Sequence, residues 1–200
     1  ARFMQLVASE RCTHSFVVPS QLIAIMQLDN FASYDTTSLE VVLTSGSPLP
    51  SSTFTAVQRG FAHSDLLELY GMSEGFCTVI GRKDYARGKG GTVGRPLHFL
   101  NTDVQLIDAN DRVVGAGEIG EIVGTSALLM NGYYKDPQRT AQSLWRDHKG
   151  RDYLRSGDLG RIDADGYLSI VGRSKDMIIS GGINVFPIDI EEVFMQHGEV

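Results

Sequence analysis

The chain has 200 residues, a formal net charge of −6 and 42% hydrophobic residues. This is the composition of a folded globular protein with a sizeable core. The acidic balance argues against a general binder of nucleic acid or of anionic membrane surfaces, because both select basic patches.

The sequence also argues against a zinc-binding protein and against a membrane-spanning one. Cys12 and Cys77 lie far apart in apolar contexts, and we expect both to be small buried side chains. The five histidines are scattered singly, without the spacing of a protein-ligated zinc site. No stretch approaches the roughly 20 apolar residues that a membrane-spanning helix needs. We therefore expect a cytoplasmic protein without an integral membrane segment.

Residues 1–84 alternate helical and strand-like patterns. Pro19 opens a mostly apolar helical stretch, and the β-branched run LEVVL at residues 39–43 predicts a strand. A helical pattern begins at Ser51, and a second short strand, residues 66–69, follows it. This alternation predicts an α/β sheet, in which ligands bind beyond the carboxyl ends of the strands.

Residues 85–174 change in character to short strand patterns separated by glycine and Asx turns, which predicts a small β-rich subdomain. Within it, Asp136 and Pro137 predict the N-cap and the first residue of a short helix that runs through QRTAQSLW. Pro187 opens a helix in the same way near the end of the chain.

Three short segments place a hydroxyl or a carboxylate on glycine-containing backbone after a strand pattern. They are Ser45–Pro48, Tyr70–Glu74 and Ser156–Asp158. A glycine after a strand is most often a tight turn, so each segment alone is weak evidence. Three such corners together indicate a ligand site.

The strings YGMSEG, GTVGRPL, NGYYKDPQRT, SGDLG, DGYLSIVGRSKDMIISGG and NVFPIDIEE resemble the signature motifs of AMP-forming acyl-CoA synthetases, members of the adenylate-forming superfamily. They occur in that family's order and spacing over nearly the whole chain. The resemblance implies that residues 1–174 are the carboxy-terminal part of a large AMP-binding domain, in which an α/β sheet subdomain is followed by a small β-rich barrel subdomain. It implies that residues 175–200 begin a small mobile α+β domain.

The resemblance also implies a site for ATP and AMP. Tyr70 would pack on adenine, Ser73 would meet phosphate oxygens, and Glu74 would ligate Mg²⁺, which prefers such oxygen ligands. Ser73 and Glu74 are thereby the candidate catalytic residues. The full set of expected ATP- and AMP-binding residues is Ser45, Gly46, Ser47, Pro48, Tyr70, Gly71, Met72, Ser73, Asp158, Ile170 and Arg173.

Of the later residues, Asp158 matches the carboxylate that holds both ribose hydroxyls in the family, through charge-assisted hydrogen bonds. Arg173 matches an arginine that contacts the nucleotide, and Ile170 an apolar residue near the sugar and base. Lys175 falls at the hinge between the two domains. Ser180, Gly181 and Gly182 resemble the loop that lines the coenzyme A tunnel.

Two parts of the family pattern are missing from the sequence. A phosphate loop with an aromatic-histidine motif would lie upstream, and a lysine that contacts the carboxylate and the phosphate would lie downstream. We therefore expect the chain to be an internal fragment that is inactive alone.

For the whole protein, the resemblance implies ATP-dependent activation of a carboxylic acid to an acyl-adenylate, followed by thioester formation with coenzyme A. ATP, Mg²⁺ and coenzyme A would be the co-substrates, and the acid could be fatty or aryl. One alternative is an adenylation domain that loads a carrier protein, although such relatives usually show YGPTE where Met72 stands here. Another alternative is a nucleotide-binding module without catalysis.

Overall fold

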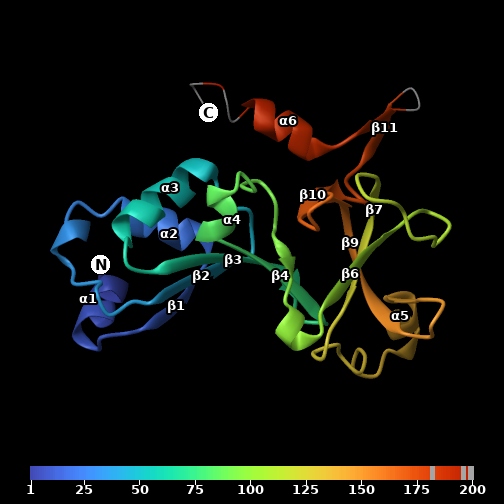
Figure 1. Cartoon of the computed structure of the whole chain (residues 1–200), viewed down its shortest axis with the longest axis horizontal. Helices are drawn as coiled ribbons and strands as arrows, with labels where there is room; N and C mark the ends of the chain where they lie inside the picture. The colour runs from blue at the N-terminus through green and yellow to red at the C-terminus, as the bar shows by residue number, and fades with distance from the viewer. Residues whose placement is uncertain (181–182, 195–196, 198–200) are drawn as a thin grey trace. The chain divides into compact units, whose positions relative to one another are not determined.

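The computed structural model describes residues 1–180, 183–194 and 197 (Figure 1). It divides the chain into two compact units. Unit 1 contains Ala1–Tyr70 and Thr78–Gly94, and unit 2 contains Gly71–Cys77 and Arg95–Val200. A domain boundary near residue 175 stays a prediction.

Unit 1 is built on strands in the order β1-β2-β3-β4, of which β1, β2 and β3 are parallel neighbours. The strands are β1 (His14–Val17), β2 (Val41–Ser45), β3 (Asp65–Met72) and β4 (Phe76–Gly81). The helices are α1 (Arg2–Ser9), α2 (Pro19–Met26), α3 (Ser51–Gly60), α4 (Arg82–Ala86) and a 3-10 turn at Phe31–Ser33. This is the predicted α/β sheet.

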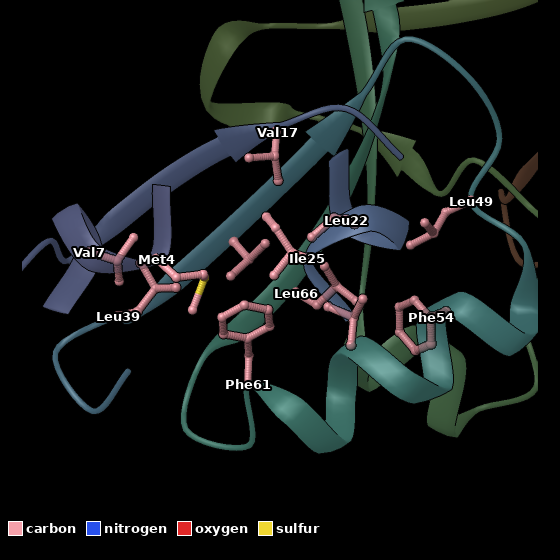
Figure 2. Close-up of a cluster of buried hydrophobic side chains, with 12 residues drawn as sticks. Met4, Val7, Val17, Leu22, Ile25, Leu39, Leu49, Phe54, Phe61 and Leu66 are labelled. Atoms are coloured by element: carbon pink, nitrogen blue, oxygen red, sulfur yellow. The ribbon is translucent and has the colours of Figure 1, made fainter. Parts of the chain in front are cut away.

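The core of unit 1 draws on α1, α2, α3 and the three parallel strands (Figure 2). Pro19 begins α2 as predicted, since its fixed φ suits the first helical turn. The buried cluster comprises Met4, Val7, Val17, Leu22, Ile25, Leu39, Val42, Leu49, Phe54, Val57, Phe61 and Leu66. These side chains pack the helices onto the sheet.

Two features of unit 1 differ from expectation. Strand β3 continues through Met72, so that Tyr70 and Gly71 are strand residues and not part of a loop. The glycine-rich basic segment after Ile80 contains α4, whose start is capped because Asp84 Oδ2 accepts a hydrogen bond from Gly81 N at 3.0 Å. Pairing with neighbouring strands and this local cap outweigh the loop-like composition.

Unit 2 contains an antiparallel sheet in the order β10-β9-β7-β6, with β8 also paired to β9. The strands of this sheet are β6 (Asp103–Ile107), β7 (Ile119–Thr125), β8 (Leu144–Arg146), β9 (Asp152–Ile162) and β10 (Leu168–Arg173). Residues of unit 2 also form β5 (Arg95–Pro96), outside this sheet, and a separate antiparallel pair of β11 (Ile178–Ser180) and β12 (Ile183–Val185). The helices of unit 2 are a 3-10 turn at His98–Leu100, α5 (Pro137–Gln142) and α6 (Pro187–Phe194).

The expected barrel is not closed in the part of the chain that the structure describes. Strands β6 and β10 are the two ends of the sheet, and they do not pair with each other. Closure needs a continuous ring of strand pairs. Strand β8 pairs with β9 and does not bridge the two edges, so the sheet stays open.

The predicted helix after Asp136 is confirmed at its start and wrong at its end. Asp136 Oδ1 accepts a hydrogen bond from Arg139 N at 2.9 Å, which is the expected N-cap. The helix stops at Gln142, because Trp145 pairs with Tyr153 across β8 and β9 and the two rings pack edge to face at 5.3 Å. Tertiary pairing here overrides local helical preference.

Other expectations have mixed outcomes. Helix α6 begins at Pro187 as predicted, and its Val193 and Phe194 are exposed. Cys12 and Cys77 are free thiols that are partly buried, less than the expected burial of small core side chains. No helix among the described residues is long and apolar enough to cross a membrane.

Candidate nucleotide site

In unit 1, the Ser45–Pro48 loop and Tyr70 lie at one edge of the parallel sheet. Ser45 is the register partner of Leu69, so Tyr70 follows directly beside the carboxyl end of β2. Gly46 has φ +103°, in the region that favours glycine, and an added Cβ would meet nothing closer than 3.7 Å. Backbone conformation therefore explains this glycine. The sheet edge is where α/β folds place ligands.

Glu68 fixes the far end of this loop, although it lies outside the residues predicted for the site. The side chain is buried; its Oε1 accepts from Leu49 N at 3.1 Å and its Oε2 accepts from the Tyr85 hydroxyl at 3.0 Å. The Tyr85 ring in turn stacks on Phe54. The signal was present in the sequence, because Glu68 shares the inward face of β3 with Leu66, where a carboxylate needs partners.

Burial raises the pKa of Glu68 above its ordinary value of 4.5, and the hydrogen bonds from Leu49 and Tyr85 only partly oppose this shift. A carboxyl group whose pKa is higher in the folded than in the unfolded protein stabilises the fold at low pH. This stabilisation is fully present below the unfolded-state pKa and is lost as pH rises through the folded-state pKa.

Glu68→Gln should therefore remove the part of the pH dependence of folding stability that comes from the Glu68 carboxyl group. The amide keeps the shape and an acceptor for Leu49 N but carries no charge. We expect the urea midpoint of the wild type, relative to that of the variant, to fall as pH rises from 4.5 through the folded pKa of Glu68. Parallel urea curves at every pH would contradict this. Glu68→Ala is the contrasting variant, since it leaves two donors unpaired at about 1–3 kcal/mol each.

In unit 2, a tight hairpin presents Ser73 and Glu74. The turn residues Ser73–Gly75 join β3 to β4, and Ser73 is exposed. At Gly71, an added Cβ would lie 2.4 Å from Phe76 O, so only glycine fits. Met130 N donates to Glu74 O at 2.8 Å and holds the turn from outside.

The donor set at this turn fits Mg²⁺ brought by a nucleotide. The described residues contain no cluster of three or more His, Cys, Asp or Glu side chains that could hold a metal. Mg²⁺ usually takes one or two carboxylates together with substrate phosphates and water, so a single partly exposed Glu74 with the Ser73 hydroxyl beside it suffices.

Asp158 lies in a bulge inside β9, not at the end of a strand as expected. Between two consecutive register pairs, β9 advances from Arg155 to Leu159 while β7 advances only from Val123 to Glu121. Gly157 has φ +73°, which permits the distortion. Asp158 N donates to Ser156 Oγ at 3.0 Å. Bulges of this kind redirect side chains next to binding sites.

The structure brings Asp158 and Arg173 together. They are register partners in β9 and β10, and Arg173 Nε lies 3.2 Å from Asp158 Oδ1. The side chain of Asp158 is 10% exposed, whereas that of Arg173 is 73% exposed. The pair therefore joins a buried carboxylate to an exposed guanidinium.

The remaining predicted residues are spread along unit 2. Ile170 is half-buried in β10 opposite Gly160, and Lys175 is exposed in the turn between β10 and β11. Ser180 ends β11, while Gly181 and Gly182 lie outside the described residues. Their roles, like those of the nucleotide contacts, stay predictions.

Comparison with known proteins decides the family. A family model described as AMP-binding enzyme matches residues 1–134 of the chain. The chain belongs to the AMP-binding enzyme family. This agrees with the motif resemblance and with the α/β architecture.

Relatives of this AMP-binding enzyme chain include coenzyme A ligases. Feruloyl-CoA synthase from Amycolatopsis sp is 38% identical over 191 residues, which cover 94% of this chain and 37% of the relative. Medium/long-chain-fatty-acid–CoA ligase FadD8 from Mycobacterium tuberculosis is 33% identical over 202 residues, covering 100% of this chain and 34% of the relative. The chain thus spans about a third of the length of these curated relatives.

A solved structure shares the fold over the whole AMP-binding enzyme chain. The amide bond synthetase McbA from Marinactinospora thermotolerans has a TM-score of 0.88 and 31% identity, and the match covers 100% of this chain and 39% of McbA. The observed fold is therefore shared with this amide bond synthetase.

Proposed function

We propose that the chain carries the nucleotide-binding part of an enzyme that activates a carboxylic acid with Mg-ATP and passes the acyl group to coenzyme A. The observation that carries the proposal is the bulge in β9, which sets the buried Asp158 against the exposed Arg173. A carboxylate so placed can accept hydrogen bonds from two ribose hydroxyls, and an arginine suits hydroxyl or phosphate oxygens.

The reaction would proceed in two steps. The acid carboxylate attacks the α-phosphate of ATP, which gives an acyl-adenylate and pyrophosphate. The thiol of coenzyme A then attacks the acyl carbon, and AMP leaves. When bound, Mg²⁺ would neutralise phosphate charge beside Glu74, and the Ser73 hydroxyl would donate to phosphate oxygens. Tyr70 and the Ser45–Pro48 loop would hold the adenine, so that the chain contributes orientation above all.

Coenzyme A is the acceptor that the relatives favour, because one is a feruloyl-CoA synthase and another, FadD8, is a medium/long-chain-fatty-acid–CoA ligase. Met72 and the segment IISGGINVFPIDIEE support the same choice over a carrier protein. A second candidate is an amine acceptor, which the likeness to an amide bond synthetase over the whole chain favours. Both candidates share the adenylation step, and aryl and fatty acids remain the two substrate classes.

Pyrophosphate release by the full-length protein tests the proposal. A panel of aryl and fatty acids is supplied with Mg-ATP, and we expect release to depend on one class of acid. The activated acid is then offered coenzyme A, a set of amines, or no acceptor, with thioester and amide measured separately. A flat response to every acid would defeat the adenylation assignment and favour a nucleotide-binding module without catalysis.

A further inference from the structure

The motif NGYYKDPQRT supplies a residue that contacts the candidate Mg²⁺ ligand. The Tyr133 hydroxyl donates a hydrogen bond to Glu74 Oε1 at 3.2 Å, across 59 residues of sequence. Glu74 Oε2 accepts no hydrogen bond in the described part of the chain. One oxygen of the carboxylate is therefore held, and the other stays available.

The position of the Tyr133 ring is itself held by residues at the start of α5. The guanidinium carbon of Arg139 lies 4.0 Å from the ring centroid, within the range of a cation–π contact. Tyr133 N donates to Thr140 Oγ1 at 2.9 Å, and Thr140 Oγ1 donates to Asp136 O at 2.9 Å. The start of α5 thus determines where the hydroxyl of Tyr133 points.

The backbone just before Tyr133 requires glycine so that Tyr133 can lie next to Thr140. Gly132 has φ +144°, and an added Cβ would lie 3.0 Å from the Thr140 side chain. Together with Met130 N on the Glu74 carbonyl, these contacts hold both the main chain and the side chain of Glu74 from one segment.

We propose that Tyr133 is a positioning residue that orients the Glu74 carboxylate for Mg²⁺, an inference that rests on the proposed nucleotide-dependent function. A carboxylate with one oxygen fixed loses less freedom when its other oxygen meets the metal. Hydrogen-bond partners of metal ligands typically change metal affinity or activity about 10- to 100-fold when they are removed.

Tyr133→Phe in the full-length enzyme removes only the hydroxyl and keeps the ring against Arg139. Tyr134→Phe is the matched control, since the neighbouring Tyr134 is 88% exposed. Two quantities are measured: the Mg²⁺ concentration at half-maximal pyrophosphate release, and the affinity for Mn²⁺ by electron paramagnetic resonance with α,β-methylene ATP bound. The second readout requires no turnover.

We expect Tyr133→Phe to weaken both quantities about 10-fold or more, with kcat at saturating Mg²⁺ within about two-fold of the wild type and Tyr134→Phe unchanged. The shift in Mn²⁺ affinity should vanish when Glu74→Gln is already present, because Tyr133 acts through that carboxylate. A merely structural Tyr133 would instead lower the melting temperature and leave metal affinity unchanged.

Three results would overturn the inference: wild-type Mn²⁺ affinity in Tyr133→Phe, an equal shift in Tyr134→Phe, or a shift that persists in the Glu74→Gln background. If Tyr133→Phe does not fold, Arg139→Gln is the second variant. Arg139 is exposed, and its loss removes the cation–π contact that holds the Tyr133 ring, so this variant must weaken Mn²⁺ binding. A wild-type enzyme that releases no pyrophosphate would refute the proposed function alone, because the Mn²⁺ measurement still tests Tyr133.

Discussion

Asp158→Ala in the full-length enzyme should lower kcat/KM for ATP about a hundred-fold or more. The carboxylate would accept two hydrogen bonds from the ribose, and hydrogen bonds to a charged group are worth about 1.5–3 kcal/mol each. The bulge places Asp158 within β9, where it pairs with Arg173 of β10, and not on a loop. The loss should therefore appear as a higher KM for ATP and as weaker binding of AMP by calorimetry.

Two variants sharpen this test. Asp158→Asn keeps the shape and one acceptor oxygen, so its loss should be smaller than that of the alanine variant. Asp165→Asn changes an exposed turn aspartate seven residues later and should leave ATP kinetics unchanged. If the Asp158 variants bind AMP like the wild type, the ribose role is wrong.

Gly94→Ala should destabilise unit 1 by about 3 kcal/mol or more, a large share of the 5–15 kcal/mol that is typical of a domain. An added Cβ would lie 1.8 Å from Val79 O and 2.6 Å from Ile80 N, both of which are backbone atoms that cannot rotate away. The residue also has φ +80°, which strains alanine by itself.

Gly91→Ala separates these two causes. Gly91 has φ +87° and nothing within 4 Å of an added Cβ, so only the backbone strain of roughly 1–2 kcal/mol should remain. Urea unfolding of both variants measures the difference, and equal midpoints would show that the close approach to β4 relaxes without cost.

Features determined by neighbouring residues could be predicted from the sequence. The starts of α2 and α5 follow from a proline that fits the first helical position, and at α5 the Asp136 cap adds a local hydrogen bond. The β-branched run before Ser45 likewise predicted β2. The order of the motifs then placed Asp158 and Arg173 in one site, although their pairing across β9 and β10 required the structure.

Features determined by distant contacts could not be predicted in the same way. Glu68 depends on Leu49 and Tyr85, which lie 19 and 17 residues away, and nothing local specifies either partner. The end of α5 is determined by the pairing of Trp145 with β9, a strand that lies later in the sequence. The motif that contains Tyr133 was visible, but its contact with Glu74 spans 59 residues.

The bulge in β9 also bears on how such a sheet can diversify. It adds an even number of residues opposite β7, since β9 advances four positions while β7 advances two. Side chains alternate with a period of two along a strand, so the strand re-enters the sheet with the same faces inward and outward as before. Residues around Asp158 can therefore be exchanged, or added two at a time, without changing which side chains of β9 face inward on either side of the bulge.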